Sequence, residues 1–137
     1  MNTGKKTVGF ICIHNSCRSQ MAEGWAEKLG GDVMDAYSAG TEKFGSIKPL
    51  AVEVMKEADA DIEGKRPKLY DEIPGRLDIL ITMGCGAACP LISAKYREDW
   101  AIEDPSGKDI SEFRKTRDII RGKVMTLIDR IKKGEYE

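Results

Sequence analysis

Short apolar runs and helical stripes of apolar residues alternate along the chain. Two of the runs are short, apolar and rich in β-branched residues, which is typical of buried strands: TVGFICI at 7–13 and LDILIT at 77–82. A third strand is predicted at 33–38. A fourth and weaker strand signal lies at 100–102, just before an Asp-Pro pair.

The segments between these runs have helical spacing. Within 16–30, apolar residues recur on one helix face, and two glycines end the segment. A second helix is predicted to begin at Pro49, because proline suits the first turn of a helix. Apolar positions between 113 and 131 predict a long C-terminal helix. Strands that alternate with amphipathic helices indicate parallel pairing through right-handed crossovers. The pattern therefore predicts one small, doubly wound α/β domain over residues 1–137.

Composition and charge narrow the possible functions without changing this picture. The 137 residues are 41% hydrophobic and 33% charged, an ordinary balance for a soluble domain that folds without disulfides or metal. Lys and Arg number 22 against 23 Asp and Glu, so charge gives no reason to expect nucleic-acid or membrane binding. The apolar runs are too short for a transmembrane helix. The first predicted strand begins at residue 7, so we expect no signal peptide before it. We expect a cytoplasmic monomer that binds neither nucleic acid nor membrane.

Four cysteines need an explanation, because thiols are normally kept reduced in the cytosol. They form two pairs that most of the chain separates, Cys12 with Cys17 and Cys85 with Cys89. The thiols could fill the core, bind a metal or react. Zinc tolerates such spacings, but Arg18 beside Cys17 argues against it, since a guanidinium repels a metal ion. We therefore expect no metal.

The segment CIHNSCRS joins the first predicted strand to the first helix. Cys12 ends the strand and Arg18 begins the helix. The loop between them can curl into a nest of N–H groups that binds a tetrahedral oxyanion, and it consists of Ile13, His14, Asn15, Ser16 and Cys17. Arg18 adds a planar guanidinium whose paired donors suit two oxygens of the same anion. The positive electrostatic field of these donors and of the loop N–H groups favours a nucleophilic thiolate at Cys12. A buried cysteine and a surface arginine without chemistry would be the simpler alternative.

This loop, together with YSAGT at 37–41 and DPSGK at 104–108, resembles the thioredoxin-coupled arsenate reductases. Those enzymes share the fold of the low-molecular-weight protein tyrosine phosphatases. The resemblance covers nearly the whole chain and keeps the family order of the landmarks. It implies a four-stranded parallel sheet of order 2-1-3-4 with helices on both faces, and this order places the loop TMGCGAACP beside Cys12. Cys85 and Cys89 should then lie near Cys12.

The resemblance also implies a reaction without metal or organic cofactor, the reduction of arsenate to arsenite. Cys12 would attack arsenic held by the loop and Arg18, while Asp104 protonates the departing oxygen. Cys85 would then attack the Cys12 sulfur, and Cys89 would complete a Cys85–Cys89 disulfide that thioredoxin reduces. Only three residues separate Cys85 from Cys89, fewer than in many relatives, so the order in which they act stays open.

Further positions match supporting residues of the family. Asn15, Ser19 and Ser38 match residues that hold the loop in shape by hydrogen bonds. Some members bind potassium near Asn15, Glu23 and Ser38. The basic segment EGKRPKL at 63–69 stands where those members have neutral or acidic ligands, which argues against potassium activation here.

Two other functions remain open from the sequence. A phosphatase would need only Cys12, Arg18 and Asp104, with water hydrolysing a phosphocysteine. Asp104 could also belong to a simple Asp-Pro turn. A sensor would bind metal or arsenic through its thiols without turnover. The pair Cys85 and Cys89 favours the reductase, and the sequence shows no aromatic-rich rim that would grip a phosphotyrosine ring.

Overall fold

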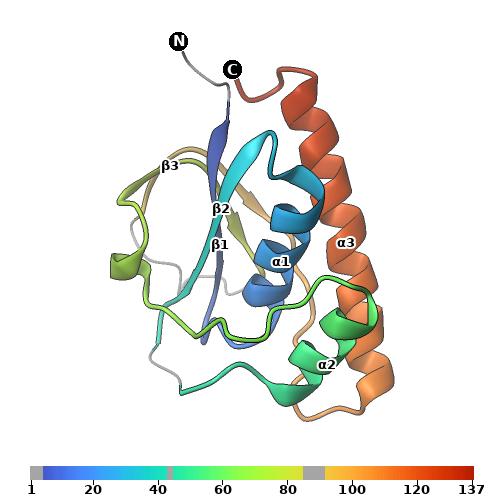
Figure 1. Cartoon of the computed structure of the whole chain (residues 1–137). Helices are drawn as coiled ribbons and strands as arrows, with labels where there is room; N and C mark the ends of the chain where they lie inside the picture. The colour runs from blue at the N-terminus through green and yellow to red at the C-terminus, as the bar shows by residue number, and fades with distance from the viewer. Residues whose placement is uncertain (1–4, 43–44, 85–91) are drawn as a thin grey trace.

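The computed structural model describes residues 5–42, 45–84 and 92–137, and its strands form one parallel sheet of order β2-β1-β3-β4 (Figure 1). The strands are β1 (Lys6–Cys12), β2 (Met34–Gly40), β3 (Arg76–Thr82) and β4 (Ser93–Asp99). The helices are α1 (Arg18–Gly30), α2 (Pro49–Glu57), the 3-10 helix η1 (Tyr70–Glu72) and α3 (Ile110–Lys132). In these described ranges, no helix is both long and apolar enough to cross a membrane.

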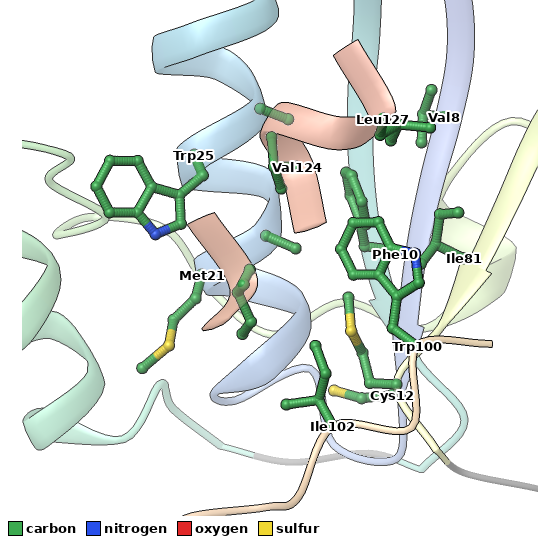
Figure 2. Close-up of a cluster of buried hydrophobic side chains, with 14 of the residues drawn as sticks. Val8, Phe10, Cys12, Met21, Trp25, Ile81, Trp100, Ile102, Val124 and Leu127 are labelled. Carbon is green, nitrogen blue, oxygen red and sulfur yellow. The ribbon is translucent and has the colours of Figure 1, made fainter. Parts of the chain in front are cut away.

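The three α-helices contact one another and cover one face of the sheet (Figure 1). Alternate residues of a strand point to opposite faces, so Phe10 of β1 turns toward these helices and Ile11 turns away. Figure 2 shows the main core, where side chains from β1, β3, α1 and α3 meet. It includes Val8, Phe10, Met21, Trp25, Ile81, Val124 and Leu127.

A smaller apolar cluster covers the other face of the sheet. It contains Ile11, Ala39, Ile73, Leu77, Leu80 and Ile92. Within the described ranges, η1 is the helix beside this cluster, and it packs against β2. The expected fold class and strand order are confirmed, and the described helices are divided unevenly between the two faces.

The predicted fourth strand was wrong. The strand lies at Ser93–Asp99, and the predicted residues 100–102 belong to the loop after it. β4 is an edge strand whose apolar residues are only Ala94 and Tyr96, so its sequence carries a weak hydrophobic pattern. The apolar signal at Trp100 comes from the core, not from a strand. Its ring is buried and packs against Phe10, with 5.7 Å between the ring centroids. The other three strands begin and end within two residues of the predicted limits. α1 begins two residues after the predicted start, α2 begins at Pro49 as predicted, and α3 begins three residues before the predicted stretch 113–131.

Gly40, the last residue of β2, lies against the loop that follows β1. A Cβ atom at this position would come within 2.6 Å of the carbonyl oxygen of Ile13 and 2.9 Å of the backbone nitrogen of Asn15. Neighbouring hydrogen bonds fix this approach, because Gly40 N–H donates to Lys68 O at 2.7 Å and Thr41 N–H donates to Ile13 O at 2.8 Å. Since all the crowded atoms belong to the backbone, they cannot rotate away.

We expect Gly40→Ala to lower the free energy of unfolding by about 1–3 kcal/mol, because the added methyl group overpacks a backbone contact. Gly122→Ala is the matched control. Gly122 lies exposed in α3 with nothing within 4 Å of the added carbon, so alanine there should stabilise the protein by up to about 1 kcal/mol. Urea unfolding measures both values. A Gly40→Ala protein as stable as the wild type would contradict the close approach.

Candidate active site

The loop between β1 and α1 forms a small cavity at the carboxyl end of the sheet. Cys12 is the last residue of β1 and Arg18 the first of α1, as the sequence predicted. The cavity has a volume of about 60 Å³, which suits one small ion. Its lining residues are Cys12, Ile13, His14, Ser16, Cys17, Arg18 and Asp104.

Two donors face the Cys12 sulfur. Ser19 Oγ lies 2.8 Å from Cys12 Sγ, and Asn15 N–H donates to the sulfur at 3.3 Å. Asn15 Nδ2 donates to Ser19 Oγ at 2.7 Å, so the hydroxyl proton of Ser19 is free to point at the sulfur. Two polar groups therefore contact the Cys12 sulfur at the edge of the cavity.

Asn15 holds this geometry with an unusual backbone conformation. Its φ is +54°, in the left-handed region that asparagine tolerates better than most residues. Its Oδ1 accepts hydrogen bonds from Gln20 Nε2 at 2.8 Å and from Lys68 N–H at 2.9 Å. These two bonds set the side-chain amide so that Nδ2 faces Ser19. Sequence reasoning missed Gln20 and Lys68. A glutamine on the buried side of α1 was the one available signal.

Arg18 is buried and held from behind by two loops. Its Nη1 donates to Met83 O at 2.6 Å and to Ile102 O at 2.9 Å. Met83 follows β3, and Ile102 lies in the loop after β4. Nη2 lies 3.7 Å from Asp104 Oδ2. Carbonyl groups thus fix one nitrogen of the guanidinium, Nη1, and the Arg18 side chain lines the cavity.

Asp104 stands at the mouth of the cavity and is held by the residue after Pro105. Ser106 N–H donates to its Oδ1 at 3.0 Å. Partial burial would raise the pKa of Asp104, but the Ser106 hydrogen bonds and the charges of Arg18 and Lys48 outweigh it. The pKa of this carboxyl group therefore lies below its ordinary value, and the group is ionised when no anion occupies the cavity.

Cys17 lines the same cavity as Cys12. Burial raises the pKa of the Cys17 thiol far above its usual range, and the negative charges of Asp104 and Cys12 act in the same direction. Arg18 and Lys48 only partly oppose them. Cys17 is therefore a neutral thiol at physiological pH.

Ser38 lies in a second polar cluster, which has a buried carboxylate at its centre. Ser38 Oγ donates to Glu23 Oε1 at 2.6 Å, and Lys65 Nζ lies 2.7 Å from Glu23 Oε2 and 2.9 Å from Glu27 Oε1. Burial alone would lower the pKa of Lys65, but its bonds to the two carboxylates outweigh this effect and raise it. An ammonium group therefore already compensates the charge of Glu23.

Three other predicted positions are His14, Cys85 and Cys89. His14 lines the cavity, and its Nε2 lies 3.3 Å from Glu42 Oε1. Cys85 and Cys89 lie outside the described residues, so their approach to Cys12 stays a prediction. Gly84, which directly precedes Cys85, is described, and Met83 before it touches Arg18. The loop after β3 therefore begins at the cavity.

Comparison with known proteins agrees with this geometry. Over residues 7–136 the chain matches the family described as low molecular weight phosphotyrosine protein phosphatase. Arsenate reductase 1 of Staphylococcus saprophyticus is 45% identical over 122 residues, which cover 85% of this chain and 92% of that protein. The solved structure of an arsenate reductase in the phosphate binding state has a TM-score of 0.84 at 36% identity, covering 92% of this chain and 98% of that one. A thioredoxin-dependent arsenate reductase of Corynebacterium glutamicum has a TM-score of 0.77 at 30% identity, covering 98% of this chain and 65% of that one. The chain thus belongs to the low molecular weight phosphotyrosine protein phosphatase family, together with these arsenate reductases.

Proposed function

We propose that this protein reduces arsenate to arsenite with its own thiols and is returned to the reduced state by thioredoxin. The observation that carries the proposal is the environment of Cys12, whose sulfur faces the Ser19 and Asn15 donors and borders a cavity of about 60 Å³ beside Arg18. A nucleophilic sulfur next to a small anion site suits attack on a tetrahedral oxyanion. Relatives that share the fold and more than a third of the sequence are arsenate reductases.

The first step joins sulfur to arsenic. The Cys12 thiolate attacks As(V) bound by the loop N–H groups and Arg18, an S–As bond forms, and one arsenate oxygen leaves as water with a proton from Asp104. In the free site Asp104 is ionised, because the Ser106 hydrogen bonds, together with the charges of Arg18 and Lys48, lower its pKa. A bound arsenate anion offsets the charge of Arg18, so Asp104 gains affinity for the proton as substrate binds.

The second step reduces the arsenic. The thiolate of Cys85 attacks the Cys12 sulfur, an S–S bond forms, and the electron pair of the S–As bond leaves with arsenic as arsenite. Cys89 then attacks Cys85 and releases the Cys12 thiolate, leaving a Cys85–Cys89 disulfide. Thioredoxin donates the two electrons that reopen it. Cytosolic conditions keep these thiols reduced, so the cycle fits the cytoplasm. We keep the monomeric state and the lack of a nucleic-acid partner as predictions.

A phosphatase activity is the second candidate, because Cys12, Arg18 and Asp104 suffice for it and all three line the cavity. A phosphate ester needs water after the attack by Cys12, whereas arsenate needs further thiols to supply two electrons. Cysteine variants therefore separate the two activities.

No metal or organic cofactor takes part in the proposed cycle, and potassium is not required. Lys65 supports the second point, since its ammonium group lies between Glu23 and Glu27 and supplies the positive charge that Glu23 needs. Gln20 links this region to the loop, because its Nε2 donates both to Arg66 O at 3.0 Å and to Asn15 Oδ1.

We expect Cys85→Ser and Cys89→Ser each to stop repeated thioredoxin-dependent turnover of arsenate while leaving hydrolysis of p-nitrophenyl phosphate intact. Cys89→Ser should complete one reduction and trap a Cys12–Cys85 disulfide, which non-reducing peptide mapping detects. Cys12→Ser, the control, should lose both activities. If both single variants kept full arsenate turnover, the redox role of the pair would be wrong and the phosphatase would become the better candidate.

We expect Arg18→Lys to lower kcat/KM for arsenate by about 100-fold although the charge is kept. A lysine ammonium cannot hold the Met83 and Ile102 carbonyl groups and still present paired donors to two oxygens of the anion. Steady-state kinetics with thioredoxin and its reductase measure the change. A loss of less than about threefold would show that only the positive charge matters.

We expect replacement of potassium by choline at constant ionic strength to leave the kcat/KM of the wild type unchanged. Lys65→Met should lower the free energy of unfolding by about 1–3 kcal/mol, because it removes the cation in contact with the buried Glu23 carboxylate and leaves only Lys68 Nζ, 3.8 Å from Glu23 Oε1. Lys56→Met is the control, since Lys56 pairs with Glu63 on the exposed surface at 3.9 Å. If the wild type needed potassium, or if the Lys65→Met and Lys56→Met proteins were equally stable, Lys65 would not be the cation that compensates the charge of Glu23.

A further inference from the structure

Asp99, the last residue of β4, binds the loops that follow both β3 and β4. Its Oδ1 accepts hydrogen bonds from Thr82 Oγ1 at 2.6 Å and from Gly84 N–H at 2.8 Å. Its Oδ2 accepts one from Ala101 N–H at 3.1 Å. Asp99 belongs to none of the motifs that mark the active site, yet one carboxylate joins two segments that are 17 residues apart in sequence.

The two loops pack together at Gly84 and Ala101, which both have a positive φ and both donate a hydrogen bond to Asp99. Gly84 has φ +92° and Ala101 has φ +49°. A residue with a Cβ atom avoids the left-handed region, so Ala101 keeps this conformation only because its surroundings impose it. A Cβ on Gly84 would lie 3.4 Å from the Cα of Ala101, which shows how closely the two turns pack. The Asp99 carboxylate fixes the N–H group of each.

Arg18 depends on the same two turns from the opposite side. Its Nη1 donates to the carbonyl of Met83, which precedes Gly84, and to the carbonyl of Ile102, which follows Ala101. The direction of these carbonyl groups sets the plane of the guanidinium, and a paired donor works only in the correct plane. We propose that Asp99 is a positioning residue that, through these two turns, aims Arg18 at the oxyanion. This inference rests on the proposed function, because it concerns the same anion site.

Binding of inorganic phosphate tests the inference without any turnover. We expect Asp99→Ala to raise the dissociation constant for phosphate about tenfold. Asp99→Asn should raise it less, because the amide oxygen still accepts from Thr82 and Gly84 whereas the amide nitrogen cannot accept from Ala101. Thr82→Val removes one donor to Asp99 and should act in the same direction. Titration calorimetry gives the constants, and circular dichroism with thermal unfolding selects the variants that are folded.

Asp61→Asn is the matched control. Asp61 is an exposed aspartate that also accepts a backbone hydrogen bond, from Glu63 N–H at 2.8 Å, but it lies in the loop after α2. This variant should bind phosphate like the wild type. If Asp99→Ala is not folded, Asp99→Asn and Thr82→Val carry the test. If all three of these bind phosphate as tightly as the Asp61→Asn protein, the positioning role is wrong.

A double variant separates positioning from a general structural role. The Arg18→Lys protein has no guanidinium whose orientation Asp99 could set. Adding Asp99→Asn to it should therefore change the dissociation constant for phosphate less than about twofold. Two fully additive effects would show that Asp99 acts independently of Arg18 and would overturn the inference.

The same measurements distinguish failure of this inference from failure of the proposed function. A wild-type protein that binds phosphate but does not reduce arsenate would refute the proposed function, while the phosphate constants would still decide the role of Asp99. A wild-type protein that reduces arsenate, with Asp99 variants that bind phosphate normally, would refute only the positioning role. Lack of phosphate binding by the wild type would refute both.

Discussion

The polar contacts of the buried Cys12 sulfur are the constraint on which the rest of the site depends. Ser19 and Asn15 direct hydrogen bonds at the sulfur, and the α1 N-terminus lies just beyond it. Asn15 can do so only in a left-handed conformation, which Gln20 and Lys68 hold from the side of α1 and from the segment before η1. The surroundings of the Cys12 sulfur therefore depend on hydrogen bonds that join distant parts of the chain.

Charge compensation links the rest of the site to this centre. Arg18 brings a positive charge to the cavity and is held by carbonyl groups from two loops, so it remains oriented before any anion arrives. Preorganised donors of this type lose little orientational freedom when the substrate binds, which is how a fixed site favours the transition state. Glu23 would be costly to bury alone, and Lys65 together with Ser38 removes that cost. Each buried charge of the two clusters thus has a partner supplied by this chain.

The sequence was sufficient to locate the loop at the cavity, because one short segment carries it. Cys12 and Arg18 stand in one loop between a strand and a helix, and that context gave the anion site, the parallel fold and the family resemblance. Residues that act across long distances in the chain were not found. Lys68 donates its backbone N–H to the side chain of Asn15, and the Asp99 carboxylate accepts from Thr82 and Gly84. Such contacts between distant positions leave no pattern in the sequence. The edge strand β4 was misplaced for a related reason, because its solvent-facing residues dilute the apolar alternation.

The central claim is that one chain passes two electrons from its own thiols to arsenic. Mixing the fully reduced protein with a limiting amount of arsenate, in the absence of thioredoxin and every other reductant, tests it most directly. Quenching by acid, followed by quantification of arsenite and of free thiols, gives the stoichiometry. The account predicts one arsenite formed for every two thiols lost, with one new disulfide in the protein. Recovery of all the arsenate with the thiols intact would contradict it.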